Sequence, residues 1–322
     1  MKLILASFLA AALSVYAAEP LSLRAKVLLP GVKGRFDHFA ADPKSGRMFV
    51  AALGNNTLEV IDARNANRIQ SVSGMSAPAG VCYIPDQNLI GVANGGRGTL
   101  DLLDGATFKT VRTVGDLDDA DNLRFNAARR QIFVGFGSGS IAFIDSQKAQ
   151  KIAEIKLKSH PESFQFQANG ARLFVNVPGA DQVAVIDCEK RAVIAEWPLH
   201  GFKANFPMSL DPSGKRVFVG CRSPSRLLAL DMESGKLLDH VEISGDTDDL
   251  FFDSKRNRIY VSCGEGFIDV ISVADTKMQR VAHTATRRGA RTSFFSVDHD
   301  ELYLAVPQRT AEPAEIWIYK PE

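Results

Sequence analysis

Ionisable side chains recur at the start of one strand-length run in several similar segments of the chain. The acidic residues of this set are Asp37, Asp121, Glu162, Asp248 and Asp249, and the basic candidates are His38, His160 and Arg291. Clustered carboxylates raise one another's pKa or hold a cation that relieves their repulsion, and such oxygen ligands suit Ca²⁺ or Mg²⁺. An imidazole can act as a general acid or base, and a guanidinium can fix an anionic substrate. The residue types therefore indicate a metal or acid–base site, provided that the fold brings these segments together.

The segments that carry these residues belong to a repeat that runs through the chain. A short apolar run occurs seven times, at 48–50, 89–91, 132–134, 173–175, 217–219, 259–261 and 302–304. The last residues of successive runs are 41 to 44 positions apart. In five repeats a second run follows and ends in an aspartate, at Asp62, Asp104, Asp145, Asp187 and Asp231. Two parallel series with one period indicate a repeat architecture.

Each repeat contains four strand-length runs separated by turn residues. In the first repeat these runs span 38–42, 47–52, 57–62 and 67–73. No stretch of comparable length has the periodicity of an amphipathic helix. The pattern predicts an all-β fold, a seven-bladed β-propeller of four-stranded antiparallel blades. Because the aspartates of the third strand recur once per blade, we interpret them as turn formers.

The two ends of the repeat array predict how the ring closes. The last repeat reaches Tyr319 with only three strands, and residues 21–29 offer a further strand with Leu23, Ala25, Val27 and Leu29 at alternate positions. Pairing of this N-terminal strand into the last blade would leave no open edge at the seam. We therefore expect residues 19–322 to form a single β-propeller domain.

Residues 1–18 have the pattern of a secretory signal peptide. Lys2 supplies the positive start, an apolar run spans 3–15, and Val15-Tyr16-Ala17 fits the small-residue cleavage rule. The alternative is a retained membrane anchor, but the apolar run is shorter than the roughly 20 residues that a spanning helix needs. We expect a periplasmic or secreted protein with no transmembrane segment after cleavage.

Composition and cysteine usage narrow the class of protein. The 322 residues are 45% hydrophobic and carry a formal net charge of +1, which argues against a disordered chain and against a nucleic-acid partner. The four cysteines, Cys82, Cys188, Cys221 and Cys263, form no CxxC pair. An exported protein can form disulfides, but cysteines scattered over strand-like runs are typical of small buried apolar residues.

Several stretches resemble the YVTN or YncE-like family of seven-bladed β-propellers. They are Arg47-Met48-Phe49-Val50-Ala51-Ala52, Gly54-Asn55-Asn56-Thr57-Leu58-Glu59-Val60-Ile61-Asp62, Gln182-Val183-Ala184-Val185-Ile186-Asp187 and Arg258-Ile259-Tyr260-Val261-Ser262. The resemblance covers about residues 20 to 320, although most repeats have Phe-Val in place of Tyr-Val. It implies a bacterial cell-surface or periplasmic protein. Similar propellers occur in lactonases, lyases and subunits of redox enzymes.

In a propeller, the candidate site residues would converge at one mouth of the central channel. Three interpretations follow, namely a water-filled channel, a bound cation, and a catalytic or ligand-binding site. The glycine-rich stretches 95–98 and 135–139 precede no helix and are expected to be hairpin turns rather than phosphate cradles. The basic stretch 286–291 is expected to be an exposed loop into the last blade.

The function we predict is a monomeric scaffold that binds a small molecule or a protein at the channel face. The alternative is a periplasmic enzyme of lactonase, lyase or hydrolase type that uses a divalent cation and the acid–base residues named above. A haem-bearing version is disfavoured because the sequence contains no CxxCH motif.

Overall fold

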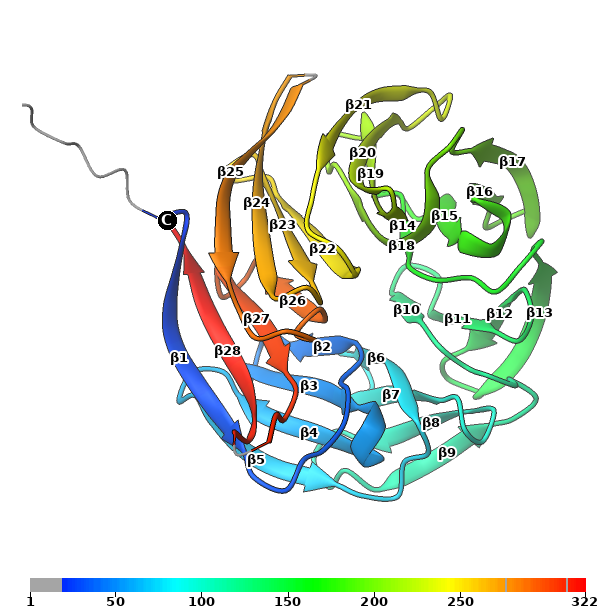
Figure 1. The fold of residues 1–322 in the computed structure, drawn as a ribbon. Coiled ribbons are helices and arrows are strands. Elements are labelled where there is room, and N and C mark those ends of the chain that lie inside the picture. The colour runs from blue at the N-terminus through cyan, green and yellow to red at the C-terminus, as the bar shows by residue number, and fades with distance from the viewer. Residues whose placement is uncertain (1–18, 276, 311) are drawn as a thin grey trace, which may run out of the picture.

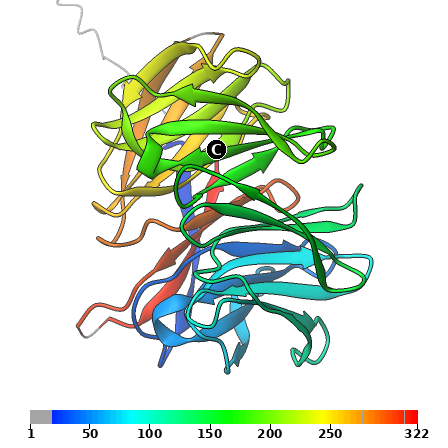
Figure 2. The same ribbon diagram turned by 90° about the vertical axis from the view of Figure 1, so that its right-hand side faces the viewer.

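The computed structural model of the protein describes residues 19–275, 277–310 and 312–322, and the predicted signal peptide lies outside these ranges. The described residues form seven four-stranded antiparallel sheets arranged as blades around a central axis (Figure 1). The ring is seen from the side in Figure 2. This architecture confirms the predicted all-β, seven-bladed β-propeller.

In the first six blades the strands follow one another outwards from the channel in sequence order. The first three blades consist of β2 (Phe39–Asp42), β3 (Arg47–Ala52), β4 (Thr57–Asp62) and β5 (Asn67–Val72), then β6 (Pro78–Ile84), β7 (Leu89–Asn94), β8 (Thr99–Asp104) and β9 (Thr110–Val114), then β10 (Leu123–Asn126), β11 (Gln131–Phe136), β12 (Ser140–Asp145) and β13 (Gln150–Lys156). The next three consist of β14 (Phe164–Phe166), β15 (Arg172–Val177), β16 (Gln182–Asp187) and β17 (Ala192–Pro198), then β18 (Lys203–Leu210), β19 (Arg216–Ser223), β20 (Ser225–Asp231) and β21 (Leu237–Glu242), then β22 (Thr247–Asp253), β23 (Arg258–Cys263), β24 (Phe267–Ala274) and β25 (Lys277–Ala285).

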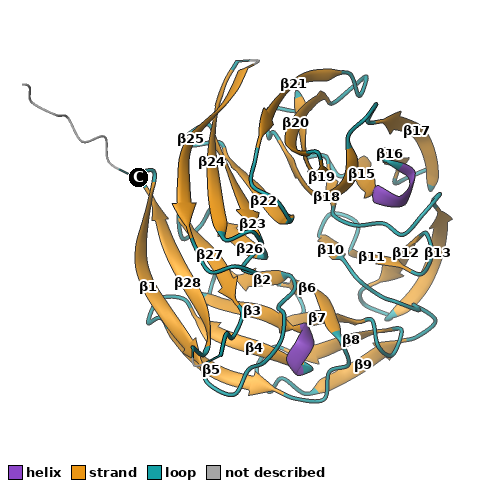
Figure 3. Cartoon of the chain, viewed as in Figure 1, coloured by secondary structure: helices purple, strands orange, loops and turns teal. Residues whose placement is uncertain are grey.

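The helical content of the described residues is limited to two 3₁₀ turns, η1 (Leu53–Asn55) and η2 (Pro178–Ala180), which appear in purple in Figure 3. Within the described ranges, no helix is long and apolar enough to cross a membrane.

The seventh blade joins the two ends of the chain. It consists of β26 (Ser293–Ser296), β27 (Glu301–Val306), β28 (Ala314–Pro321) and, at its outer edge, β1 (Leu21–Leu29). β1 pairs antiparallel with β28, with Val27 opposite Ile316 and Leu29 opposite Ala314. Val27 and Leu29 are buried in the core between the first and seventh blades. The predicted closure by the N-terminal strand is confirmed.

The core lies between the faces of neighbouring blades. The second and third strands of a blade are covered on both faces, so nearly every residue of β3 and β4 is buried. The outer strand β5 is mostly exposed. Aromatic contacts join adjacent blades, as where Phe133 of β11 packs edge-on against Phe166 of β14. Burial on both faces explains why the sequence shows continuous apolar runs rather than alternation at these strands.

The two structural interpretations of recurrent residues are confirmed. The third-strand aspartates accept hydrogen bonds from the backbone N–H groups two and three positions ahead, at 2.7–3.2 Å, in the turns after Asp62, Asp104, Asp145, Asp187 and Asp231. All four cysteines are buried and unpaired. Burial raises the pKa of the Cys188 thiol to about 11 and that of Cys221 to about 12.

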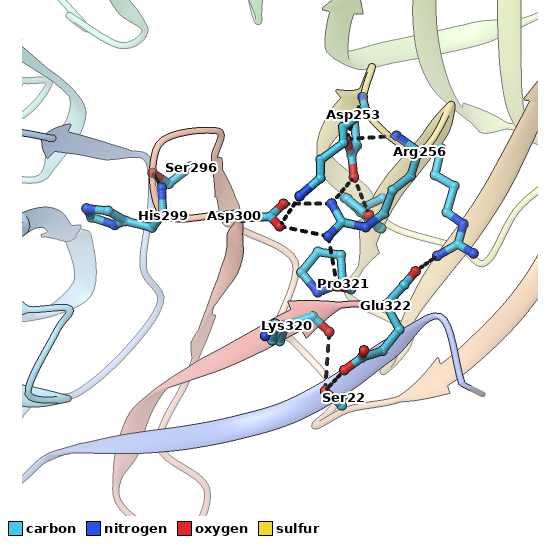
Figure 4. A network of polar contacts seen from close by, with 12 residues as sticks. Ser22, Asp253, Arg256, Ser296, His299, Asp300, Lys320, Pro321 and Glu322 are labelled. Atoms are coloured by element: carbon cyan, nitrogen blue, oxygen red, sulfur yellow. Dashed lines mark hydrogen bonds and ion pairs between the residues drawn. The ribbon is translucent and has the colours of Figure 1, made fainter.

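A polar network fastens the sixth blade to the seventh beside the chain terminus (Figure 4). We call Asp253, Arg256 and Asp300 the seam network. Arg256 donates to both carboxylate oxygens of Asp300, at 2.6 and 2.8 Å, to Asp253 at 2.9 Å and to the carbonyl of Pro321 at 3.0 Å. The hydroxyl of Ser22 in β1 donates to the Glu322 carboxylate at 2.8 Å. The seam is therefore held by charged groups as well as by the β1–β28 ladder.

Candidate functional site

The structure brings most of the candidate residues together around one cavity. This polar cavity has a volume of about 530 Å³ and lies where the inner strands begin. Its ionisable lining comprises Arg35, Asp37, His38, Asp119, Asp121, His160, Glu162, Arg222, Asp248 and Arg291. These side chains come from the loops before β2, β10, β14 and β26, and from β19 and β22. The repeat places one such loop per blade at the same end of the channel, which explains the convergence.

Asp249 is the one predicted site residue that does not line the polar cavity. Its carboxylate accepts the backbone N–H of Ser293 at 2.9 Å and lies 3.6 Å from Nδ1 of His38. Asp249 lines a second cavity further along the channel. The register of β22 shifts between Thr247 and Asp249. Asp248 lines the polar cavity, and Asp249 lines the second cavity.

One side of the polar cavity combines carboxylates with imidazoles. Oδ1 of Asp37 lies 3.4 Å from Nε2 of His38, and Oδ2 of Asp121 lies 3.4 Å from Nε2 of His160. Single oxygen and nitrogen atoms of Asp37, His38 and Asp121 lie within 4.8 Å of one another, and so do those of Asp121, His160 and Glu162. Asp121 is thus shared by two sets of groups that are each able to hold a metal ion.

Two carboxyl groups on this side, those of Asp37 and Glu162, have pKa values well above the ordinary range of carboxyl groups. Burial raises the pKa of Asp37 to about 7, with added repulsion from Asp121 and partial relief from His38. Burial, followed by repulsion from Asp121, raises the pKa of Glu162 to about 8. Among the described residues, no arginine or lysine forms an ion pair with Asp37 or Glu162. The negative charge of Glu162 is opposed by the two histidines, and that of Asp37 is opposed by His38 and, to a smaller extent, by Arg35.

The two histidines are held by carboxylates that favour the charged imidazolium. The hydrogen bond to Asp121 is the largest cause that raises the pKa of His160 to about 9, against the effect of burial. Nδ1 of His160 donates to the carbonyl of Gly137 at 2.6 Å. Burial alone would lower the pKa of His38, but Asp37 and Asp249 outweigh it and raise that pKa to about 10.

Asn122 connects His38 to an arginine further along the channel. Nδ2 of Asn122 lies 2.7 Å from Nε2 of His38, and its Oδ1 accepts from Arg124 at 3.0 Å. A charged imidazole donates from both nitrogens, so it requires the amide to be reversed and its oxygen to face His38. The charge state of His38 is thereby linked to the hydrogen bonding of Arg124.

The opposite side of the polar cavity is built from arginines. Arg222 donates to Oδ1 of Asp248 at 2.5 Å, and Nε of Arg291 lies 3.0 Å from Oδ2 of the same carboxylate. Arg291 also donates to Asp246 at 2.6 Å, and the guanidinium of Arg222 stacks 3.6 Å above the ring of Phe206. Burial raises the pKa of Asp248 although both arginines oppose that effect. Asp248 is therefore engaged by arginines and lies outside both metal-compatible sets.

Sequence reasoning missed Arg222 and Arg124. Arg222 lies at the end of the second strand of its blade rather than on the inner strand, and the hairpin after β19 carries it to the cavity. The glycine-rich stretches 95–98 and 135–139 connect β7 to β8 and β11 to β12, as expected of hairpin turns. Within the basic stretch, Arg287 pairs with Glu312 and Glu315, whereas Arg291 reaches the polar cavity.

Comparison with known proteins shows the fold. No family model matches the chain. A chain in the crystal structure of a mitotic checkpoint complex is similar to it, with a TM-score of 0.79 over 98% of this chain and 97% of that chain. Because the two sequences are only 15% identical, the similarity shows the fold alone. The protein is therefore a seven-bladed β-propeller, and its membership of the YVTN or YncE-like family stays a prediction.

Proposed function

We propose that the protein is an exported binding scaffold of the YVTN or YncE-like type, whose polar cavity binds a divalent cation. The observation that carries this proposal is Asp121, whose carboxylate belongs to two sets of potential ligand atoms that each span no more than 4.8 Å. Each set combines two carboxylates with one imidazole. This mixture suits Zn²⁺ or Mn²⁺, whereas carboxylates alone would favour Ca²⁺ or Mg²⁺.

The distribution of charge in the cavity supports a cationic occupant. Asp37, Asp121 and Glu162 crowd one side, and Arg222 and Arg291 are occupied with Asp248 and Asp246. Arg35 lowers the pKa of Asp37 but forms no ion pair with it. A bound cation would neutralise the crowded carboxylates and release their protons. A ligand that carries its own cation, for example an amine, would relieve the same repulsion.

The test begins with elemental analysis of protein exported with its own leader and purified without a chelator. Chelator-treated protein is then titrated calorimetrically with Zn²⁺, Mn²⁺, Ca²⁺ and Mg²⁺. We expect stoichiometric binding of at least one of these ions, and stabilisation of about 2.7 kcal/mol at a free-ion concentration of one hundred times Kd. Asp121→Asn removes the shared ligand and is expected to abolish binding.

Asp119→Asn is the matched control, because it removes the same charge from a rim position whose side chain is 75% exposed. Absence of bound ion in the purified protein, together with no thermal shift from any of the four ions, would reject the cation site. Equal binding by the Asp119→Asn and Asp121→Asn variants would reject the assigned ligands.

Export is tested separately. N-terminal sequencing of the protein recovered from a periplasmic extract should place the first mature residue at Ala18 or Glu19. A product that retains Met1 and remains in the membrane fraction would favour the anchor alternative instead.

A specific observation also favours the enzymatic alternative. Glu162, with a pKa raised to about 8, keeps its proton at neutral pH beside the ionisable His160. A protonated carboxyl group in such a cavity can serve as a general acid. A lactone or ester whose turnover is lost in Glu162→Gln, while the melting temperature is kept, would establish this function. Turnover equal to that of the wild type would eliminate Glu162 as the acid.

A further inference from the structure

The channel contains a second cavity beside the proposed cation site. We call it the aromatic cavity. It has a volume of about 510 Å³ and is lined by residues one to several positions further along the same inner strands. His38 lines both cavities and stands between them. The second cavity therefore lies deeper along the channel, towards the end opposite the polar cavity.

The walls of the aromatic cavity differ in chemistry from those of the polar cavity. Six of the seven blades contribute one aromatic residue each, namely Phe39, Tyr83, Phe125, Phe166, Phe251 and Phe294. All of these except Phe39 are only partly buried. Phe251 and Phe294 meet edge to face with ring centroids 5.8 Å apart. Partly exposed rings around a concave space offer faces and edges to a flat apolar ligand.

Arg124 is the cationic side chain of this cavity, and it has no carboxylate partner among the described residues. Its Nη1 donates to Oδ1 of Asn122 at 3.0 Å and to the carbonyl of Leu123 at 2.7 Å. No hydrogen bond from its Nε or Nη2 is formed within the described ranges. Its guanidinium also lies 5.6 Å from the ring of Phe164. Nε and Nη2 of the guanidinium therefore remain available to a ligand.

The nearby carboxylate of Asp249 favours the charged guanidinium through its negative charge, but it forms no ion pair with Arg124. Asp249 lines the same cavity, but its carboxylate is occupied by the N–H of Ser293 and by His38. Burial lowers the pKa of Arg124, and the negative charges of Asp249 and Asp121 oppose this effect only in part. A buried guanidinium without a carboxylate is costly, and an incoming anion would remove that cost.

We propose that the aromatic cavity binds a small aromatic carboxylate, with the carboxylate on Arg124 and the ring among the surrounding aromatic side chains. The planar guanidinium matches a carboxylate through paired N–H donors. The volume of the cavity lies in the range of small-molecule sites. Arg124 belongs to neither set of proposed cation ligands, although Asn122 connects it to His38, which belongs to one of them.

The experiment uses naphthoate and its neutral isostere naphthamide as probes, titrated calorimetrically into the mature protein. We expect saturable binding of one naphthoate and an affinity for naphthamide about tenfold lower or weaker still. Arg124→Gln should lower naphthoate affinity by about tenfold or more and leave naphthamide binding unchanged. Phe251→Ala should weaken both probes.

Arg130→Gln is the matched control, since it removes an arginine of the same blade whose side chain is 60% exposed. Naphthoate affinity should be unchanged in this variant and in Glu162→Gln, which removes a proposed cation ligand whose charge is not among those that act on Arg124. Arg124→Lys keeps the charge but loses the paired donors, and it replaces Arg124→Gln if that variant does not fold. Equal affinity for the two probes, unchanged naphthoate affinity in the Arg124 variants, or no saturable binding of naphthoate would overturn the proposal.

Discussion

The seam network and the polar cavity contain the same types of charged residue, but burial and ion pairing shift the pKa values of their carboxyl groups in opposite directions. At the seam, both oxygens of Asp300 accept from Arg256, and Lys255 donates to it at 2.7 Å. These hydrogen bonds lower the pKa of Asp300 well below its usual range and raise that of Arg256 (Figure 4). In the polar cavity, burial instead raises the pKa of Asp37 and Glu162.

The difference separates a structural cluster from a candidate binding site. At the seam each carboxylate already has its cation, so a ligand would add nothing. On the carboxylate side of the polar cavity, no arginine of the described residues forms an ion pair with Asp37 or Glu162, and Arg35 opposes the charge of Asp37 only in part. Departures from internal pairing of this kind are concentrated at functional sites.

The largest change in the free energy of unfolding is expected when Arg256 is replaced. Arg256→Ala leaves the buried carboxylate of Asp253 without its cation and breaks the contact with Asp300. We expect the free energy of unfolding to fall by about 3 kcal/mol, as measured by urea denaturation. Arg130→Ala, which breaks an exposed pair of 3.9 Å with Asp86, should change it by no more than about 0.5 kcal/mol. Equal losses in the two variants would show that the seam network stabilises no more than a surface pair.

The next largest effect is a gain in stability on replacing Glu162, and it depends on pH. Glu162 has a folded-state pKa of about 8 against a reference value of 4.5, so the folded protein binds more protons than the unfolded chain. Its contribution to stability is present below the unfolded pKa and is lost as the pH rises through about 8.

Glu162→Gln should therefore stabilise the metal-free protein by about 2 kcal/mol at about pH 8 and by little at about pH 5. Glu189→Gln, at an exposed position, should leave the urea midpoint unchanged at both values. A destabilised Glu162→Gln variant at the higher pH would mean that the ionised carboxylate is favourably paired in the fold.

A smaller effect is expected for Asp300 in acid. Its folded-state pKa is lowered, so its contribution is present above the unfolded value of 3.8 and is lost as the pH falls through the folded value. Asp300→Asn should cost about 1 kcal/mol at neutral pH and flatten the acid limb of a plot of melting temperature against pH. An acid limb identical to that of the wild type would assign the loss of stability to other carboxylates.

The smallest effect is expected at the rim of the polar cavity. Asp119 lies 3.8 Å from His160, but its side chain is 75% exposed. Asp119→Asn should change the free energy of unfolding by less than about 0.5 kcal/mol, by the same urea measurement. A larger change would mean that the contribution of a charged side chain to stability depends on its proximity to the cavity rather than on its burial.

The sequence predicted the fold almost completely because the repeat displays it seven times. The position of β1 beside β28 followed from counting strands in the last repeat and from the alternation of residues 21–29. The register of this pair, which shifts between Leu23 and Ala25, did not follow from the sequence. For the site, the repeat identified which loops meet, and Asp37, Asp121 and Glu162 line one cavity as expected.

What the repeat could not give was the direction of individual side chains. Asp248 and Asp249 were grouped by type, but the register shift in β22 sends them to different cavities. Arg222 was missed because it comes from the second strand of its blade rather than from the inner strand. The partners of a side chain depend on residues of neighbouring blades, and the sequence repeat does not show which of these residues it contacts.

The pairing of β1 with β28 also sets an order of events during synthesis. Leu21 lies opposite Pro321 in the finished ring, so the strand that leaves the ribosome before all the other described strands must wait for the one that leaves after them. Contacts of such separation are slow to form, and an unpaired strand edge invites wrong partners in the meantime. The ring is therefore completed only after its seventh blade has been synthesised, and a nascent chain halted before β28 has no native partner for its first strand.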